Sequence, residues 1–533
     1  MLTSEGGLDN QTYVLGVTVA IVAALLVVTR RALVSAAVAN GLILTAVAIA
    51  SAKFSAMGMV LHAYDIFFYL SSWSTISYLW SDFRTLALGL ALLLALLAAT
   101  AVVSWRIDTT RVARWRSALL FCAAVAVALG GSYWKGERRH TQYYWEDMHL
   151  SSFYSSWADT VETLLRGQLI ESAASASGPL IRLPTTCAGP AKPPHIILVH
   201  EESVVPPAYF PKLAYDKSLD PFFRSHDGQL HKLRVETYGG ASWLTEFSIL
   251  AGVSTRSFGG MRNFVQSLMA GKIYDTLPET LARCGYRNAV FYPMMRNFVS
   301  NEKFYKAVGL KQVFDATDQK APTYQERDRF YFGNALDYMS RHISRSRQPL
   351  FVFVQTMATH SPYDFKFSPD SDVPGGGPGT DAEMSEYLRR LGLAARDYRD
   401  FRNKLAERFP SEQFLIVHYG DHQPVATRPL LGIDSNLEAE DIELALNSPG
   451  FLTYYAVDGI NYQPPPLPTV ATLDVPYMPL VILEAAGLPL SDSYKERKAL
   501  LATCDGRYYT CAERERILAF HRRLIDSGLI IPY

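Results

Sequence analysis

The sequence has no excess of charge of either sign. Its 533 residues include 51 Lys and Arg and 51 Asp and Glu, so the formal net charge at pH 7 is zero. A protein that binds nucleic acid in bulk carries a basic excess, because its contacts are made mainly to phosphates. The balance of charges excludes a protein of that class, and we expect no nucleic-acid partner.

Charged side chains are scarce at the start of the chain. The first 133 residues contain 13 of them, against 89 in the remaining 400. A helix that crosses a membrane needs about 20 apolar residues. The charge-poor start of this chain is long enough to supply several such helices, which excludes a purely cytosolic soluble enzyme. Four stretches qualify as spans: Tyr13–Thr29, Ala32–Ser51, Thr85–Trp105 and Ser117–Tyr133. Met57–Trp80, which contains His62 and Asp65, is either a fifth span or an interfacial helix.

The orientation follows from one short loop. Four arginines lie between the last two spans, at positions 106, 111, 114 and 116, and positively charged loops stay in the cytoplasm. Everything after residue 133 is then outside the cytoplasm. The N-terminus is inside with five spans and outside with four. The first span follows a polar decapeptide without a small-residue cleavage site, which favours an uncleaved anchor.

Cysteine is also scarce. The five cysteines form no CxxC pair, which excludes a zinc site of that type. Cys504 and Cys511 bracket the turn-like segment Asp505-Gly506-Arg507. In an oxidising compartment they would close a small hairpin disulfide, and two free thiols are the equally weighted alternative.

The rest of the chain divides into a juxtamembrane helical connector at 134–193, helical through Tyr143–Glu171, and a domain at 194–533. In that domain, short apolar runs typical of buried strands alternate with helical patterns. The runs are His195–His200, Asn288–Tyr292, Leu350–Gln355 and Phe414–His418, and the helices are Thr276–Cys284, Phe330–His342, Ala382–Arg408 and Tyr477–Ala486. This alternation predicts an α/β domain with a mostly parallel sheet covered by helices.

Polar residues follow the predicted strands, at the edge where ligands bind in α/β sheets. Glu201-Glu202-Ser203 follows the first run, Thr356–His360 the third and Tyr419–Gln423 the fourth, while Gly239-Gly240-Ala241-Ser242 precedes a helix. Each element alone is weak evidence, but the four together in this order predict a divalent-metal site. Carboxylate and imidazole ligands suit manganese or zinc better than magnesium.

The same residues carry a resemblance. Tyr419-Gly-Asp-His422, His200-Glu-Glu-Ser203 and Ser242-x-x-Thr-Glu-Phe247 resemble the lipoteichoic acid synthase and phosphoglycerol transferase branch of the alkaline phosphatase–sulfatase superfamily. The similarity runs through about His195–Leu488 and, more loosely, the spans. It implies a multi-pass protein of the bacterial cytoplasmic (inner) membrane. It also implies an alkaline phosphatase/sulfatase-like catalytic domain on the periplasmic or extracytoplasmic side.

Site residues carried over from this resemblance are expectations. Glu202, Asp421 and His422 would hold one Mn²⁺, or another divalent ion such as Zn²⁺ or Mg²⁺. Ser242 would be the nucleophile and would also touch the metal, and His360 would lie near the transferred group. The family's Trp and Arg against the headgroup are replaced by Phe298-Val-Ser-Asn-Glu-Lys303. We therefore expect Arg296 or Lys303 to contact the phosphate instead.

The implied activity is transfer of a phosphoglycerol headgroup, through a phospho-Ser242 intermediate. The donor would be phosphatidylglycerol and the acceptor a glycan or lipid. Three alternatives stay open: a phosphoethanolamine transferase, whose relatives tend to carry several disulfides; a metal-dependent phosphodiesterase with water as acceptor; and a silent membrane protein of polysaccharide assembly. A sulfatase reaction is excluded, because Ser242–Glu246 lacks the Pro and Arg of the C/S-x-P-x-R sequence that formylglycine formation needs.

Overall fold

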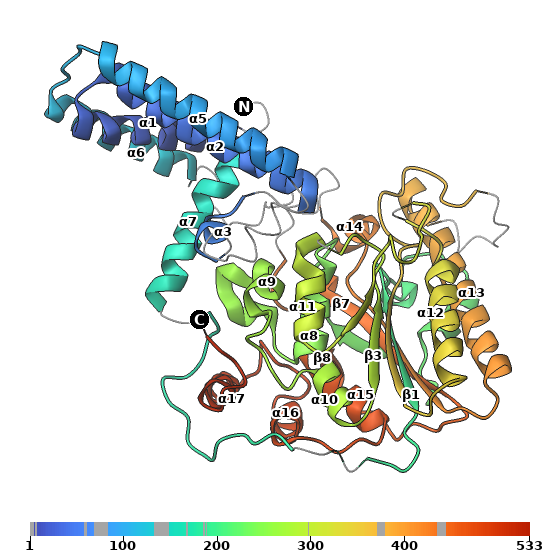
Figure 1. Cartoon of the computed structure of the whole chain (residues 1–533). Coiled ribbons are helices and arrows are strands. Elements are labelled where there is room, and N and C mark those ends of the chain that lie inside the picture. The colour runs from blue at the N-terminus through green and yellow to red at the C-terminus, as the bar shows by residue number, and fades with distance from the viewer. Residues whose placement is uncertain are drawn as a thin grey trace. The chain divides into compact units, whose positions relative to one another are not determined.

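The computed structural model describes residues 5, 8–57, 61–68, 84–132, 149–166, 169–184, 187, 189–296, 298–323, 325–369, 379–433 and 444–532. The chain divides into two compact units, Met1–Gly167 and Gln168–Tyr533, whose elements are labelled in Figure 1. The predicted boundaries at 133 and 193 stay predictions.

The first unit is built on four helices that are long and apolar enough to cross a membrane. They are α1 (Leu8–Thr29), α2 (Ala32–Met57), α5 (Arg84–Ile107) and α6 (Arg114–Ser132), and each contains most of a predicted span. Two more helices are described, α3 (Ala63–Phe68) and α7 (His149–Arg166). The alternative fifth span at Met57–Trp80 lies largely outside the described residues.

Small residues let two of these helices pack closely. A Cβ on Gly16 of α1 would lie 2.5 Å from the backbone nitrogen of Ala128 in α6, and one on Gly131 would lie 2.7 Å from that of Tyr13. The two helices are therefore antiparallel and in backbone contact, as membrane helices with small interface residues are. In contrast, α5 exposes leucines along its length, which suits a lipid-facing helix.

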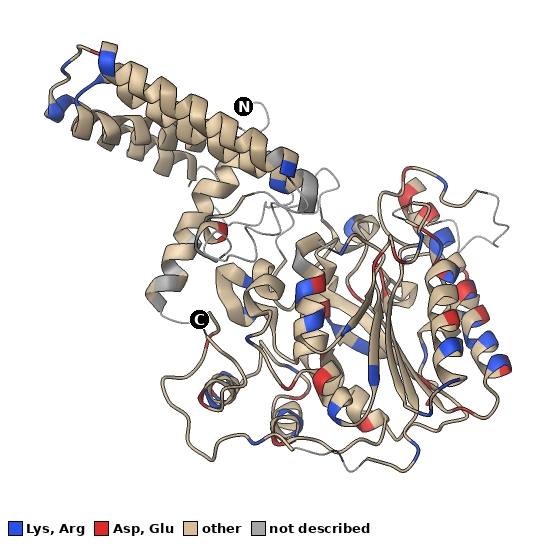
Figure 2. Ribbon diagram, viewed as in Figure 1, with Lys and Arg blue, Asp and Glu red and all other residues tan. Residues whose placement is uncertain are grey.

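The two ends of this unit differ in charge. The connections α1–α2 and α5–α6 meet at one end, where the Arg31 guanidinium donates to the Trp105 carbonyl and lies 4.3 Å from its ring centroid. Six arginines lie in or beside these connections, and Figure 2 shows them gathered there. At the other end, the Glu5 carboxylate accepts the Leu150 and Ser151 N–H groups of α7, at 2.9 Å each. The basic end and the α7 end are therefore opposite.

The second unit contains a mixed eight-stranded sheet in the order β4-β3-β5-β1-β6-β7-β2-β8. The first five strands in that order are parallel, and β7 is antiparallel to both neighbours. The strands are β1 (His195–Glu201), β2 (His231–Arg234), β3 (Arg287–Phe291), β4 (Gln312–Phe314), β5 (Leu350–Gln355), β6 (Phe414–Gly420), β7 (Leu452–Ile460) and β8 (Leu473–Asp474). The predicted mostly parallel α/β sheet is confirmed, with β1, β3, β5 and β6 at the predicted runs.

The register brings the ends of the central strands together. Every residue of β1, β5 and β6 is buried, as expected for strands covered on both faces. Within this register, Val199 of β1 lies between Val354 of β5 and His418 of β6. The segments that follow these three parallel strands therefore leave the sheet at the same edge.

Helices cover both faces of the sheet, with α12 and α13 on one side and α8, α10 and α15 on the other (Figure 1). The helices of this unit are α8 (Ser242–Ala251), α9 (Val265–Met269), α10 (Leu277–Arg283), α11 (Asn301–Ala307), α12 (Asp328–Ile343), α13 (Ala382–Arg408), α14 (Arg428–Leu431), α15 (Met478–Ala485), α16 (Asp492–Thr503) and α17 (Arg514–Asp526). The four predicted helices correspond to α10, α12, α13 and α15. A capping box between Thr276 and Glu279 starts α10.

Two disulfides cross-link the second unit. Cys504 and Cys511 are bonded, which confirms the disulfide over the free thiols. A second bond joins Cys187, in the segment before β1, to Cys284, directly after α10. The sequence does not predict this second pair.

Candidate metal and nucleophile site

Ser242 is the first residue of α8, and it lies at the edge where β1 and β6 end. Ala241 before it has a left-handed backbone, with φ 61°. The Ser242 Oγ donates to Glu202 Oε2 at 3.0 Å and lies 3.3 Å from His422 Nε2. The unpaired N–H groups at a helix start stabilise negative charge, so this position favours an oxygen that develops negative charge.

Backbone donors hold the Asp421 carboxylate in place. Its Oδ1 accepts the N–H groups of Ser203 and His422, both at 2.7 Å. The Thr245 hydroxyl of α8 donates to the Asp421 carbonyl at 2.7 Å, which ties the helix to the loop after β6. Burial opposes the ionised form, but the neighbouring His422 and His200 lower the pKa of Asp421 below its ordinary value. Asp421 is therefore a buried, ionised carboxylate.

His422 presents one particular nitrogen to the other site residues. Its Nδ1 lies 3.0 Å from the Gln423 carbonyl oxygen, so Nδ1 carries the hydrogen and donates it. In the neutral imidazole, the form that can bind a metal, the Nε2 lone pair then points to the cluster, 3.5 Å from Glu202 Oε1 and 3.4 Å from Asp421 Oδ2. A backbone carbonyl that fixes the tautomer in this way is a common support for a metal-binding imidazole.

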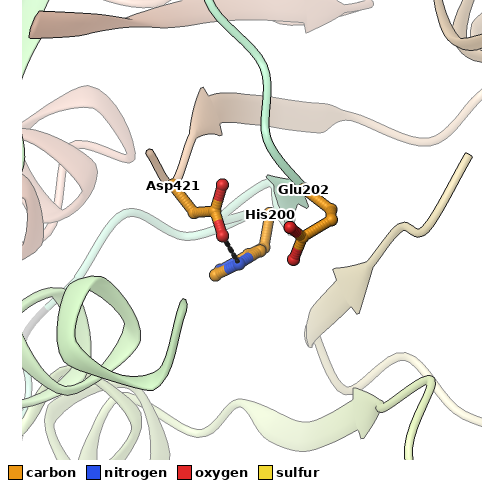
Figure 3. A group of neighbouring side chains, drawn as sticks. All are labelled: His200, Glu202 and Asp421. Atoms are coloured by element: carbon orange, nitrogen blue, oxygen red, sulfur yellow. Dashed lines mark hydrogen bonds and ion pairs between the residues drawn. The ribbon is translucent and has the colours of Figure 1, made fainter. Parts of the chain in front are cut away.

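His200 joins this group, although the sequence analysis does not single it out. Its Nε2 lies 3.1 Å from Asp421 Oδ2, and its Nδ1 lies 2.7 Å from the Tyr419 hydroxyl. An ionised carboxylate can only accept, so Nε2–H donates to Asp421. Figure 3 shows this contact, with Glu202 beside it. Burial disfavours the charged imidazole, but Asp421 outweighs it and raises the pKa of His200.

These residues have the donor set of a divalent-metal site. Ligand atoms of His200, Glu202 and Asp421 all lie within 4.8 Å of one another, and all three side chains are buried. Two buried carboxylates this close need a cation or protons to offset their repulsion. Glu202, Asp421 and the free Nε2 of His422 fit a metal ion. His200, whose Nε2–H is used by Asp421, fits a supporting position.

The two neighbouring glutamates point to different surroundings. The Glu201 Oε2 accepts from the Thr356 hydroxyl at 3.2 Å, away from Ser242. Burial and then the nearby Asp328 raise the pKa of Glu201 well above its ordinary value. Glu202 therefore lies in the cluster and Glu201 lies behind it.

His360 lies at the end of the loop after β5. The Gln325 amide and the Arg390 guanidinium donate to its carbonyl oxygen at 3.0 and 2.7 Å. The preceding Thr359 hydroxyl donates to the Glu202 carbonyl at 2.5 Å. The loop that carries His360 is thereby tied to the residue that contacts Ser242.

The two predicted phosphate contacts differ in their surroundings. The Arg296 guanidinium forms ion pairs with Asp315 at 2.9 Å, Asp318 at 3.0 Å and Glu302 at 3.5 Å. It is committed to three carboxylates, which makes it a poor phosphate ligand. Lys303 is exposed on α11. The assignment of either residue to substrate stays a prediction.

Comparison with known proteins identifies the fold of the second unit. Residues 233–443 match the family model Sulfatase. An uncharacterised protein of Haemophilus influenzae is 23% identical over 326 residues, which are 59% of this chain and only about half (55%) of that relative's length. The Streptococcus pyogenes phosphoglycerol transferase GacH, in complex with sn-glycerol-1-phosphate, superposes with a TM-score of 0.50 and 17% identity, over 64% of this chain and 87% of GacH.

The lipoteichoic acid synthase LtaP of Listeria monocytogenes gives a TM-score of 0.43 and 16% identity, over 56% of this chain and 72% of LtaP. The Sulfatase match and the GacH superposition agree on one architecture. The second unit has the sulfatase/alkaline phosphatase-like fold, and the resemblance inferred from the sequence is confirmed at that level.

Proposed function

We propose that this chain is a membrane-anchored, metal-dependent phosphotransferase. It moves a phosphoglycerol headgroup from phosphatidylglycerol to a glycan or glycolipid acceptor through a phospho-Ser242 intermediate. One observation carries the proposal: the Ser242 Oγ lies at a helix start, 3.0 Å from Glu202 Oε2 and 3.3 Å from His422 Nε2. The shared fold with a phosphoglycerol transferase supports it.

A serine hydroxyl is a weak nucleophile at neutral pH and needs activation. A divalent ion held by Glu202, Asp421, His422 and the Ser242 Oγ would lower the pKa of that hydroxyl and stabilise negative charge on the reacting oxygens. Mn²⁺ is our first choice, with Zn²⁺ or Mg²⁺ as the alternatives. The chain itself places the hydroxyl against an acceptor, because Glu202 Oε2 accepts the Oγ hydrogen.

The first half-reaction forms one bond and breaks one. The Ser242 hydroxyl gives its proton to Glu202 Oε2, which already accepts its hydrogen bond. The Oγ bonds to the phosphorus of the lipid headgroup, and the bond from phosphorus to the diacylglycerol oxygen breaks. In our proposal His360 donates the proton to that leaving oxygen. In the second half-reaction the acceptor hydroxyl gives its proton to His360 and attacks the phosphorus. The bond from phosphorus to the Ser242 Oγ breaks, and Ser242 takes its proton back from Glu202.

The first unit supports a lipid donor and an orientation. Four membrane-spanning helices keep the second unit close to phospholipid. The arginine-rich connections fit the cytoplasmic side, since basic loops are retained there. The α7 end then faces outward, and two disulfides suit an oxidising compartment. We therefore propose a bacterial cytoplasmic membrane with the catalytic unit on the extracytoplasmic side.

Phosphoethanolamine transfer is the second candidate. The two disulfides of the second unit favour it, because exported domains of such transferases tend to be disulfide-bonded. The metal cluster and nucleophile would be the same in both reactions. The headgroup is then the one difference to test.

The test uses the full chain with Mn²⁺ and either phosphatidylglycerol or phosphatidylethanolamine, followed by mass spectrometry of the Ser242 peptide. We expect one phosphoglycerol on that peptide, and none in a Ser242→Ala variant. A phosphoethanolamine adduct would select the second candidate. Release of headgroup phosphate without an adduct or transfer product would indicate a hydrolase, and no reaction with either lipid would contradict the proposal.

A further inference from the structure

A cavity of about 310 Å³ lies between α12 and α13. That volume is at the lower end of the range for small-molecule sites, about 300–1,000 Å³. None of its lining residues belongs to the cluster around Ser242. The cavity therefore needs an explanation of its own.

One part of the cavity wall, the aromatic floor, is formed by two phenylalanines. Another part, its base, is an ion pair between two residues of the protein. The rings of Phe332 and Phe401 stack with centroids 4.6 Å apart. At the base, Arg327 donates to both oxygens of the buried Asp397 carboxylate, which also accepts the Arg329 N–H at 3.2 Å. The charge of Asp397 is thereby offset within the protein. Four other charged residues line the cavity: Arg329, Arg396, Asp400 and Lys404.

Three of these four residues are cationic. Arg396, Asp400 and Lys404 follow one another at intervals of four along α13, so they lie on one face of that helix. Arg329 adds a further positive charge from α12. Three cations against one carboxylate give this part of the wall a net charge of +2. Such a wall attracts anions, and guanidinium groups match the geometry of phosphate oxygens.

Gly333 lines the same cavity, and the protein's own packing does not require a glycine there. A Cβ added at this position meets no atom within 4 Å. Gly333 is in the interior of α12 and does not have a positive φ. Glycine is among the poorest helix formers, and alanine would fit here. Its presence keeps open a space that a larger side chain would occupy.

We propose that this cavity is a binding site for a small phosphorylated sugar, separate from the Ser242 site. Arg329, Arg396 and Lys404 bind the phosphate. Asp400 accepts hydrogen bonds from sugar hydroxyls, and the apolar face of the sugar lies toward the aromatic floor. This mixture of an apolar surface with a few polar groups is typical of small-molecule sites. The inference does not rest on the proposed transferase reaction.

The test measures binding of glucose 1-phosphate to the full chain by titration calorimetry. The protein is purified in detergent and treated with EDTA, so that the metal site is empty. Inorganic phosphate and glucose are titrated separately as the two halves of the probe. We expect saturable binding of glucose 1-phosphate, weaker binding of phosphate and none of glucose. Arg396→Gln should weaken binding at least about 10-fold, because it removes a charged hydrogen-bond donor.

Two further comparisons separate the cavity from general charge attraction. Arg399→Gln makes the same change at an exposed position on α13 outside the lining, and should leave the affinity unchanged. Gly333→Leu should abolish binding by filling the cavity, whereas Gly333→Ala should retain most of it.

Three results would overturn the site: no binding of glucose 1-phosphate, an equal loss in Arg396→Gln and Arg399→Gln, or binding that Glu202→Gln removes and Arg396→Gln does not. The last result would place the sugar phosphate at the Ser242 site. If Gly333→Leu does not fold, the comparison of Arg396→Gln with Arg399→Gln still tests whether the cavity binds the sugar phosphate.

Discussion

The Nε2 of His422 lies 3.3 Å from the Oγ of Ser242, although 180 residues separate them in the chain. The contact exists because α8 begins at the same edge of the sheet where β6 ends. The His422 Nδ1–H donates to the Gln423 carbonyl, so in the neutral imidazole the nitrogen that faces Ser242 carries the lone pair. This relationship joins the proposed nucleophile to the proposed metal ligands and leads to the first prediction.

Replacing Ser242 by alanine should lower turnover to below about a thousandth of the native rate, because it removes the proposed nucleophile. Ser242→Thr should retain measurable activity, since it keeps a hydroxyl on the same carbon. Steady-state transfer from labelled phosphatidylglycerol measures both. Ser248→Ala is the control, because Ser248 is a buried serine of the same helix that contacts Glu236 at 3.2 Å. Substantial turnover in Ser242→Ala would refute the nucleophile assignment.

His200→Phe should weaken Mn²⁺ binding about 10–100-fold, as loss of a residue that supports a metal ligand commonly does. Phenylalanine keeps a ring in place but removes the donor that contacts Asp421 Oδ2. Tyr419→Phe removes only the hydroxyl against His200 Nδ1 and should have a smaller effect. Calorimetric titration of Mn²⁺ into metal-free protein measures the affinity of both variants against that of the native protein. Unchanged affinity in His200→Phe would contradict the supporting role.

His360→Gln should lower kcat by about 10²–10⁴, the usual range for a general acid or base, and leave Mn²⁺ affinity unchanged. Gln325 and Arg390 donate to the backbone carbonyl of residue 360, and these bonds should hold the loop in place. The substitution also removes the contact between the His360 Nδ1 and the Ser361 carbonyl. His231→Gln, at the edge of β2 beside Asp227, is the control. Parallel loss of activity and metal affinity would show that His360 acts on the structure of the site and not on proton transfer.

Much of this site could be predicted from residue order, and the reasons for the omissions are physical. Glu202, Asp421 and His422 follow strands and Ser242 begins a helix, and a parallel sheet brings such segments to one edge. His200 is the sixth residue of an apolar strand and looks like a core residue. Its role depends on Asp421, 221 residues later in the chain. No local sequence pattern predicts that two residues so far apart in the chain are in contact.

Contacts between residues far apart in the chain explain other features that the sequence analysis did not predict. Cys187 and Cys284 are 97 residues apart, and only the fold brings them together. The expected phosphate contact of Arg296 stays a prediction, and the sequence alone does not reveal that Asp315 and Asp318 bind its guanidinium. Strand β7 was not predicted, because its polar and aromatic residues lack the continuous apolar run of β1. Local periodicity therefore predicts many of the helices and strands. Which charged side chains form ion pairs within the protein depends on tertiary contacts, which the local sequence does not reveal.

Removing the Cys187–Cys284 bond should destabilise the second unit more than removing Cys504–Cys511. The two bonds close segments with separations of 97 and 7 residues. In the chain-entropy model these correspond to about 5 and about 2 kcal/mol. Chemical denaturation of the two double Cys→Ser variants, monitored by Trp243 fluorescence or proteolysis, tests the order. A larger loss from the Cys504/Cys511 pair would mean that strain or residual structure in the unfolded chain outweighs loop length.

Glu246 makes the stability of the metal-free protein depend on pH. Burial raises its pKa from 4.5 to about 7, although His200 and the hydrogen bonds from Tyr305, Gln355 and Gln266 oppose the shift. Between about pH 4.5 and pH 7 the folded chain therefore holds a proton that the unfolded chain has lost. The free energy of unfolding contributed by this group must fall as the pH rises through that window.

Glu246→Gln removes the ionisable group and keeps a side chain of nearly the same shape. The variant should unfold at higher denaturant than the native protein above pH 7, by up to roughly 3 kcal/mol. Below about pH 4.5 the difference should largely disappear, because Glu246 is protonated in both states there. Glu407→Gln, at an exposed position on α13, should show no such dependence. A stabilisation that is the same at pH 4 and pH 8 would mean that the carboxyl does not titrate in this range.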